Sequence, residues 1–265
     1  MAGWELLAPR RRLTVSKSIR WTNNLGIVAL NTVILRLIFP AAAVGIAAFA
    51  HSQGWGILHY LQLPFWVSLI ISVIVLDAVI YTQHVLVHAI PILWRLHRVH
   101  HADLDFDVTT GSRFHPIEII FSMLIKFAAI ILIGPPVMAV LIFEVLLNAT
   151  SMFNHANVRI PPSLDRILRW FIVTPDMHRV HHSVEDDETN SNFGFNFPWW
   201  DRLFGTYRNQ PRAGHEQMII GINTYRDQQH CSWLPGMLVL PFIGKISDYA
   251  INRREWKTDT ETDKQ

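Results

Sequence analysis

The sequence predicts an all-α, polytopic membrane protein with about four transmembrane or membrane-inserted helices and a histidine-rich cytoplasmic helical cap. Three observations predict this class. The chain of 265 residues is 50% hydrophobic and only 17% charged, whereas roughly a quarter of the residues of soluble proteins are charged. It contains four long apolar runs, and its mean hydropathy is +0.22. Its 14 histidines gather mainly where apolar runs end.

Composition also excludes several classes of protein. A net charge of +2, with no basic stripe interleaved with aromatic residues, argues against nucleic acid as a partner. The only cysteine is Cys231. It permits neither an intrachain disulfide nor a metal cluster held by thiolates.

The first apolar run covers residues 27–50 and follows a basic N-terminal segment. It is long enough to cross a bilayer, which takes about 20 residues, and we expect its one charged residue, Arg36, to snorkel. No cleavable signal peptide is predicted, because the apolar run begins too far behind the N-terminal charges. The second run extends from Leu63 through Tyr81 and continues as a helical pattern to about Ile90.

The third and fourth runs, residues 117–133 and 137–148, are joined by Gly134-Pro135-Pro136. This turn signal predicts a tight helical hairpin, whose short arms reach only part-way across the bilayer unless their polar ends extend them. Lys126 and Glu144 lie at similar distances from the turn. We predict that they pair, since charges inside a membrane usually find partners; the alternative is that each faces another helix or snorkels. A fifth stretch, residues 233–243, contains two prolines and is expected to be interfacial.

The distribution of basic residues predicts the orientation and the organisation of the chain. The N-terminal arginines and the histidine-rich segments are separated by an even number of crossings, and the connection 51–62 has no Lys or Arg. The positive-inside rule therefore places both termini and the histidines in the cytoplasm. We expect a cytoplasmic N-terminal segment (1–26), a membrane-embedded domain (27–250, with its histidine-rich core at 67–207) and a polar, disordered C-terminal tail (251–265).

Most of the histidines recur at helical spacing. Residues 84–88 read HVLVH, and HRVHH occurs twice, at 97–101 and 178–182. Positions three and four apart share one face of a helix, close enough for two imidazoles to reach one metal. So many histidines would form a dense cationic cluster unless a metal held them neutral. Eight to ten ligands exceed the four that one zinc takes and favour two metals with open positions. Imidazole alone does not choose among zinc, copper, iron and nickel. His51, His59, His215 and His230 lack this spacing.

The order of these motifs resembles the fatty acid hydroxylase and sterol desaturase superfamily of integral membrane di-iron enzymes. The resemblance covers residues 67–207 and rests on HVLVH, HRVHH, RFHPIE, NHAN, TPDMHRVHHS and NSNFGFNFPWWDRLFGTY. Alkylglycerol monooxygenases share this general pattern. The resemblance implies two iron ions, with zinc as a substitute acquired during purification or crystallisation, together with O2 as oxidant. It implies a lipid substrate from the bilayer, of the fatty acyl, sterol or ether lipid type, that is hydroxylated or desaturated.

The family's metal ligands carry over to eight histidines, which are also the expected catalytic residues: His84, His88, His97, His100, His101, His178, His181 and His182. His155, in NHAN, is expected to be a ninth metal ligand. No cofactor-binding residue is expected beyond these.

Four further residues are candidates for binding the metal or supporting its ligands. His115 could do either. Asn192 could bind through water or cap a helix, and the structural role is favoured. Asp77 could orient His84 or pair with Arg36. Asp176 comes just before the second HRVHH motif (178–182) and is the carboxylate favoured for this supporting role.

Other polar and aromatic side chains are expected to have structural roles. Glu118 is expected to be an acid at a helix N-terminus, while the acids at positions 103, 105 and 107 and the acidic run 185–188 are expected in solvated loops. The aromatic residues of 193–200 are expected to anchor the cap at the headgroups, with closure of the site as the alternative.

The chain shows no GxGxxG fingerprint and no CxxC-type iron–sulfur run. A separate electron donor of the ferredoxin, cytochrome or reductase type is therefore expected. Since no electron-transfer domain is appended, a bacterial inner membrane is favoured over the endoplasmic reticulum.

Three other classes of protein fit the sequence less well than an oxygenase does. A membrane metal transporter would place its ligands near the bilayer midplane, whereas these histidines lie at helix ends and in loops. A zinc-dependent membrane hydrolase would need a general-base Glu, as in HExxH, which is missing. A purely structural protein leaves the two HRVHH repeats unexplained.

Overall fold

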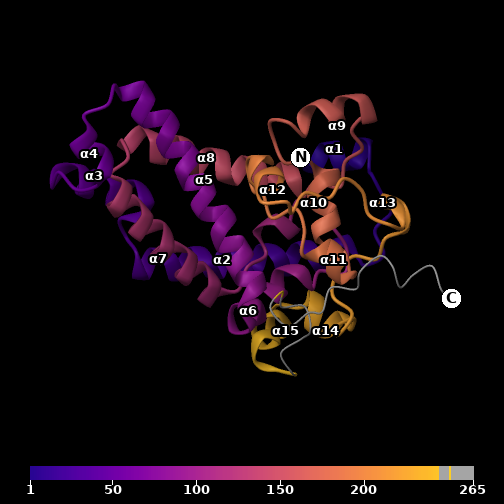
Figure 1. Ribbon diagram of the computed structural model, residues 1–265. Helices are drawn as coiled ribbons and strands as arrows, with labels where there is room; N and C mark the ends of the chain where they lie inside the picture. Colours follow the sequence, from indigo (N-terminus) through magenta and orange to yellow (C-terminus); the bar gives the residue numbers. More distant parts are fainter. Residues whose placement is uncertain (245–250, 252–265) are drawn as a thin grey trace.

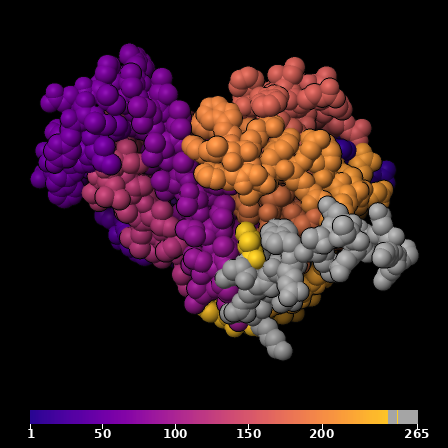
Figure 2. All heavy atoms as spheres, viewed as in Figure 1, coloured from indigo at the N-terminus to yellow at the C-terminus, as the bar shows by residue number. Residues whose placement is uncertain are grey.

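The computed structural model describes residues 1–244 and 251. Within these residues the chain is mostly helical, and its β pairing is limited to isolated bridges. Figure 1 shows the long helices on one side and the short helices α9 to α15 on the other. In the space-filling view the same halves lie side by side, indigo to magenta against orange (Figure 2). The long helices form the membrane bundle, and the short ones form the cap.

Four helical segments are long and apolar enough to cross a membrane: residues 17–52, Phe65–Ala89 (α5), Pro116–Ile133 (α7) and Val137–Asn154 (α8). This confirms the expected class of fold, and the chain is an integral membrane protein. The bundle is held by an apolar core that includes Ala47, Leu76, Ile130 and Phe143.

The first apolar run differs from its expected form in two ways. Instead of one helix over residues 27–50, the chain forms α2 (Lys17–Ile38) and α3 (Ala42–Ser52), followed by the short α4 (Ile57–Leu61). The break coincides with Pro40, which has no N–H to donate and clashes with the preceding turn of a helix. The helix α2 also begins ten residues earlier than the apolar run. It runs through residue 26, so the division of the chain at residues 26 and 250 stays a prediction.

The hairpin of α7 and α8 is confirmed. Gly134 ends α7 with φ at +67°, a left-handed conformation that favours glycine, and Pro135 and Pro136 lead into α8. Lys126 Nζ lies 2.7 Å from Glu144 Oε1, so the predicted pairing is also confirmed.

The short elements of the cap surround the ends of the bundle. The helix α6 (Pro91–His101) follows α5 after a single residue, Ile90, whose extended backbone is typical of a residue before proline. The remaining elements are α1 (Ala2–Leu7), η1 (Thr110–Ser112), α9 (Pro162–Leu168), α10 (Pro175–His181), α11 (Asp186–Thr189), α12 (Trp199–Leu203), α13 (Gly214–Gln217), α14 (Gln228–Ser232), α15 (Leu234–Val239) and η2 (Leu240–Phe242).

Two acidic segments expected in solvated loops are instead part of the cap's interior. Arg20 of α2 donates to Asp103 and Asp107, and all three side chains are buried. Asp105 accepts hydrogen bonds from the backbone N–H groups of residues 14 and 15. In the run 185–188, Glu188 is buried and accepts from the backbone N–H of residue 212. Buried carboxylates need such partners, and these come from distant parts of the chain.

The stretch 233–243 forms α15 and η2 beneath α6. Met237 and Leu240 are buried in a core shared with Ile27 and Trp94, while Trp233 and Phe242 are exposed. Its position at the membrane interface stays a prediction. Of the expected C-terminal tail, only residue 251 belongs to the described residues.

Candidate metal centre

Nine buried histidines form two adjacent groups at the junction of the bundle and the cap. In each group the ring nitrogens that could bind a metal lie within 4.8 Å of one another. The five-histidine group consists of His84, His88, His97, His101 and His181, and the four-histidine group consists of His100, His155, His178 and His182. All nine positions expected to bind metal are therefore brought together.

Local sequence explains how each element presents its histidines. On α5, His84 and His88 are one helical turn apart and share a face. The helices α6 and α10 begin at Pro91 and Pro175, in the first-turn position that tolerates proline. His155 and His182 are the first residues after α8 and α10, where the backbone turns and aims them back at the cluster.

Hydrogen bonds determine which nitrogen carries the proton in two rings of the five-histidine group. His84 Nδ1 lies 2.8 Å from the carbonyl oxygen of Phe193, and His181 Nδ1 lies 2.8 Å from that of Ser191. A carbonyl only accepts, so both Nδ1 atoms carry the proton, and in a neutral ring Nε2 is left with a lone pair. These two Nε2 atoms are only 3.0 Å apart. Two facing lone pairs repel each other, and a cation between them would remove the repulsion.

The four-histidine group repeats this arrangement around one ring. His155 Nδ1 donates to the carbonyl oxygen of Ser151 at 2.9 Å, which leaves a lone pair on Nε2. That atom lies 3.2 Å from His100 Nε2 and 3.1 Å from His178 Nε2. The three atoms converge on a single point, as ligands of one metal do.

Burial favours the neutral form of six histidines of the centre. It lowers the pKa of His181 to about 3 and that of His155 to about 4. It also lowers the pKa of His100, His101, His178 and His182 well below the ordinary value. Neutral imidazole is the form that binds metals, so the donor set fits a metal ion at neutral pH.

One carboxylate contacts the histidines, and it differs from the one expected. Glu118 Oε1 lies 2.6 Å from His97 Nδ1, and both side chains are buried. In the described residues, His97 Nε2 has no hydrogen-bond partner. Glu118 thus orients His97 toward the other four rings, as carboxylates commonly do for metal-binding histidines. Glu118 lies two residues after the His115-Pro116 pair, at the start of α7. This closeness to a histidine motif is the sequence feature that could have indicated its contact with the centre.

The four secondary candidates lie outside both groups. His115 is the N-cap of α7, and its Nδ1 accepts from the backbone N–H of residue 117. Asp77 accepts from Trp200 Nε1 of α12 at 2.8 Å and from the backbone N–H groups of residues 196 and 197, not from His84 or Arg36. It thus holds α12 and the segment before it against α5. Asp176 pairs with Arg10, Arg179 and His215. Asn192 joins the backbone of residues 177 and 208.

In the aromatic segment after the last histidines, Phe193 covers one side of the site, while the expected anchoring of the cap at the headgroups stays a prediction. Phe193 is buried, and its ring centroid lies 5.6, 5.1 and 5.4 Å from those of His84, His88 and His181. Asp201 accepts hydrogen bonds from the backbone N–H groups of Phe193 and Gly194, each at 2.8 Å. Trp199 alone of this segment's tryptophans is exposed enough to serve as an anchor.

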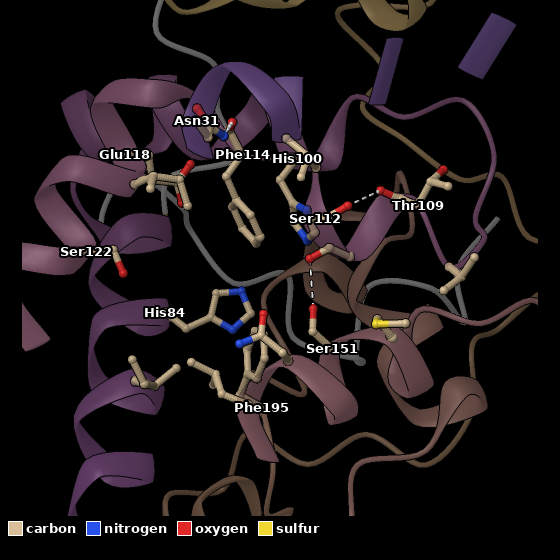
Figure 3. A pocket seen from close by; sticks show the side chains of 18 of the residues that line it. Asn31, His84, His100, Thr109, Ser112, Phe114, Glu118, Ser122, Ser151 and Phe195 are labelled. Atoms are coloured by element: carbon tan, nitrogen blue, oxygen red, sulfur yellow. Dashed lines mark hydrogen bonds between the residues drawn. The ribbon is translucent and has the colours of Figure 1, made fainter. Parts of the chain in front are cut away.

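A cavity of about 770 Å³ leads from the bundle to both histidine groups. Its walls come from α2, α5, α7 and α8, and four of its lining residues are histidines of the centre: His84, His97, His100 and His178. Figure 3 shows His84 and His100 projecting into it from two sides, with Phe114 and Phe195 nearby. A long apolar molecule in this cavity would therefore extend to the metal centre.

Fold and site together define a membrane protein with two adjacent groups of buried histidines, each of which could hold a metal ion. The fatty acid hydroxylase family matches residues 69–206, more than half of the chain. The chain belongs to this family.

Known relatives agree with this assignment. The chain is 32% identical to ornithine lipid hydroxylase OlsE of Rhizobium tropici, over 66% of this chain and 51% of the relative. It is 27% identical to alkylglycerol monooxygenase of Xenopus tropicalis (78% and 47%) and 24% identical to cholesterol 25-hydroxylase of Rattus norvegicus (54% and 48%). The chain thus spans about half the length of these relatives. No solved structure matches it.

Proposed function

We propose that this chain is a di-iron oxygenase that uses O2 and external electrons to hydroxylate or desaturate a C–H bond of a lipid. One observation carries the proposal: lone pairs of buried, neutral histidines converge at two adjacent points beside an apolar cavity. Membership of the fatty acid hydroxylase family supports it. So do relatives named as hydroxylases or monooxygenases of ornithine lipid, alkylglycerol and cholesterol.

The five-histidine group would hold one iron and the four-histidine group the other. Such a pair of irons supplies the activation of dioxygen and the removal of hydrogen from an unactivated C–H bond. Zinc could occupy the same ligands as a substitute in purified protein, because imidazole binds both metals. Nine histidines exceed what a single zinc takes, which supports two metals. Iron is proposed as the working metal because zinc has no redox chemistry, whereas the relatives are named as hydroxylases or monooxygenases.

The chain's own residues prepare this chemistry. The carbonyls of Phe193 and Ser191 hold the protons of His84 and His181 on Nδ1, so that each Nε2 is free to bind metal. Glu118 does the same for His97. The ring of Phe193 excludes water from one side of the centre. The cavity walls hold the lipid chain beside His84 and His100.

The lipid would enter from the bilayer, and a separate ferredoxin-, cytochrome- or reductase-type donor would bring electrons to the cap. We place both termini and the metal centre on the cytoplasmic side, in a bacterial inner membrane. The contact of Arg10 with Asp176 supports this in part, because it puts the N-terminal segment on the same side as the cap.

Two other functions are less well supported by the site. A transporter would carry its ligands near the midplane of the membrane, whereas these histidines lie near the C-terminal ends of α5 and α8 and on the short helices α6 and α10. A zinc hydrolase would need a carboxylate free to act on water, but Glu118 is engaged with His97.

Elemental analysis of the protein purified in mild detergent tests the proposal. We expect about two irons per chain, lost when His181 and His182 are both changed to Ala. The matched control changes His51 and His59, which lie outside the centre, and should keep both irons. A single zinc per chain, or a metal content that H181A/H182A leaves unchanged, would overturn the proposal in favour of the hydrolase or transporter.

A further inference from the structure

An ion pair lies in the wall of the cavity, in the apolar middle of the hairpin. Lys126 Nζ and Glu144 Oε1 are 2.7 Å apart, and their side chains are 8% and 26% exposed. Both line the cavity. Each is eight residues from the turn, Lys126 before Gly134 and Glu144 after Pro136, which at 1.5 Å per residue is about 12 Å along its helix. Charges at such depth are costly and are usually functional.

Further polar side chains connect this ion pair with the metal centre. Glu118, Ser122 and Lys126 follow one another at intervals of four on α7, so they share a face, and all three line the cavity. Glu118 contacts His97, and Ser122 exchanges hydrogen bonds with Gln83 of α5. Figure 3 shows Glu118 and Ser122 on the cavity wall. The ion pair therefore lies two helical turns, about 12 Å, beyond the carboxylate that orients the metal ligand.

A second wall of the cavity has an unsatisfied polar atom. Asn31 of α2 is 93% buried, since its exposed fraction is 7%. Its Nδ2 donates to the carbonyl oxygen of Phe114 at 2.9 Å. Among the described residues, its Oδ1 has no hydrogen-bond partner. A buried acceptor without a partner is costly, and a polar group bound in the cavity would remove that cost.

We propose that Lys126 and Glu144 form a polar subsite that binds an uncharged hydrogen-bonding group, such as a hydroxyl or amide, on the lipid substrate. This inference rests on the proposed function and narrows its substrate class. Lys126 donates and Glu144 accepts, so the pair satisfies a group that does both. The pair has no net charge, so a carboxylate or phosphate attracted by Lys126 would be repelled by Glu144. A lipid held here by its polar group would extend toward the histidines in a single orientation.

A merely structural ion pair is the competing explanation. The hairpin does not need one, because Ile130, Val140 and Phe143 already pack between its arms and their neighbours. Replacing a buried ion pair by apolar residues of similar size is often neutral or stabilising. The charge on this wall is better explained by a ligand that uses it.

The inference is tested by the binding of lipids that share a chain length and differ in their polar group. This measurement needs neither catalytic turnover nor an electron donor. The probes are 1-hexadecanol, hexadecane and hexadecanoate, measured by mass spectrometry of the lipid retained after gel filtration. We expect the wild type to bind hexadecanol at least about tenfold tighter than hexadecane, equivalent to about 1.4 kcal/mol, and tighter than hexadecanoate. In K126M/E144L this preference should fall to about twofold or less. The reversed pair, K126E/E144K, should keep most of it.

The matched control changes two neighbouring residues that face away from the cavity, Leu124→Met and Val145→Leu, both largely exposed on the outside of the bundle. This variant should bind all three lipids as the wild type does. An unchanged preference in K126M/E144L, or tighter binding of hexadecanoate than of hexadecanol, would overturn the inference. Iron content is measured on the same samples. A wild type that prefers hexadecanol but binds no iron would sink the proposed function and leave the subsite standing.

Discussion

The two histidine groups differ in how firmly their rings are held. In the five-histidine group, four rings have a hydrogen-bond partner on Nδ1, supplied by Phe193, Asn190, Glu118 and Ser191. In the four-histidine group only His155 has one, and the Nδ1 atoms of His100, His178 and His182 have no partner among the described residues. Outer partners orient metal ligands and raise their basicity. The comparison therefore predicts one tightly held and one more readily lost metal.

The largest expected effect comes from His181 and His182, adjacent residues that belong to different groups. H181A and H182A should each lose about one of two metals, because each removes a ligand from one group only. Elemental analysis of the two variants beside His59→Ala, a histidine outside the centre, measures this. Loss of both metals in each single variant would show that the two groups form one cooperative site. It would contradict the prediction that the two groups hold their metals independently.

Removing the outer carboxylate should have the next largest effect. E118Q keeps the size of the side chain but loses the charge beside His97, so the affinity of the five-histidine group should fall about 10–100-fold. Metal retention during titration with a chelator measures the change. The control is E216Q, an acid on the exposed surface of the cap. Equal retention in E118Q and wild type would mean that Glu118 only caps its helix.

A chelator should remove the two metals in sequence. The metal of the four-histidine group should leave at least about tenfold faster, since fewer of its rings are oriented by outer partners. Metal remaining per chain is followed over time in wild type and in H182A. The fast phase should be missing in H182A. A single phase in the wild type would contradict the predicted difference between the groups.

The smallest expected effect concerns Asp201, which holds the backbone that presents the Phe193 carbonyl to His84. Burial raises the pKa of Asp201 to about 6, above an ordinary value of about 3.9. A carboxyl with a raised folded-state pKa binds its proton more tightly in the native protein. This residue's contribution to stability therefore increases as pH falls from above 6 toward 4, and is lost as pH rises through 6.

Thermal unfolding in detergent at pH 7.5 and 5.5 checks this sign. D201N should show a smaller gain in stability at pH 5.5 than wild type does. E185Q, which changes an exposed acid of the cap, should behave as wild type. An identical pH dependence in D201N would show that Asp201 does not titrate in this range.

The positions of the nine histidines could be predicted from the sequence, but their division into two groups could not. Successive residues of a helix point about 100° apart, so the HRVHH boxes are split between the groups: His97 and His101 lie in one and His100 in the other. Which of the two groups each side chain of a motif joins depends on how the helices α5, α6 and α10 cross.

Several polar residues were misjudged for a related reason. The acids at 103, 105 and 107 look like a solvated loop because their partners, Arg20 and the backbone of residues 14 and 15, are more than 80 residues away in the sequence. The closeness of Asp77 and Asp176 to histidines in the sequence predicts that they lie beside them. In the structure Asp77 contacts Trp200 and Asp176 contacts Arg10. The carboxylate that contacts a histidine of the centre is that of Glu118.

The sequence by itself determined the class of fold, the hairpin with its ion pair, and the set of histidines. These depend on local patterns: apolar length, a Gly-Pro-Pro turn and the spacing of side chains on one helix. Only the tertiary structure decided the two histidine groups, the carboxylate that orients His97, and the cavity whose wall contains Lys126 and Glu144. These depend on contacts between residues far apart in the chain, which the packing of the helices alone creates.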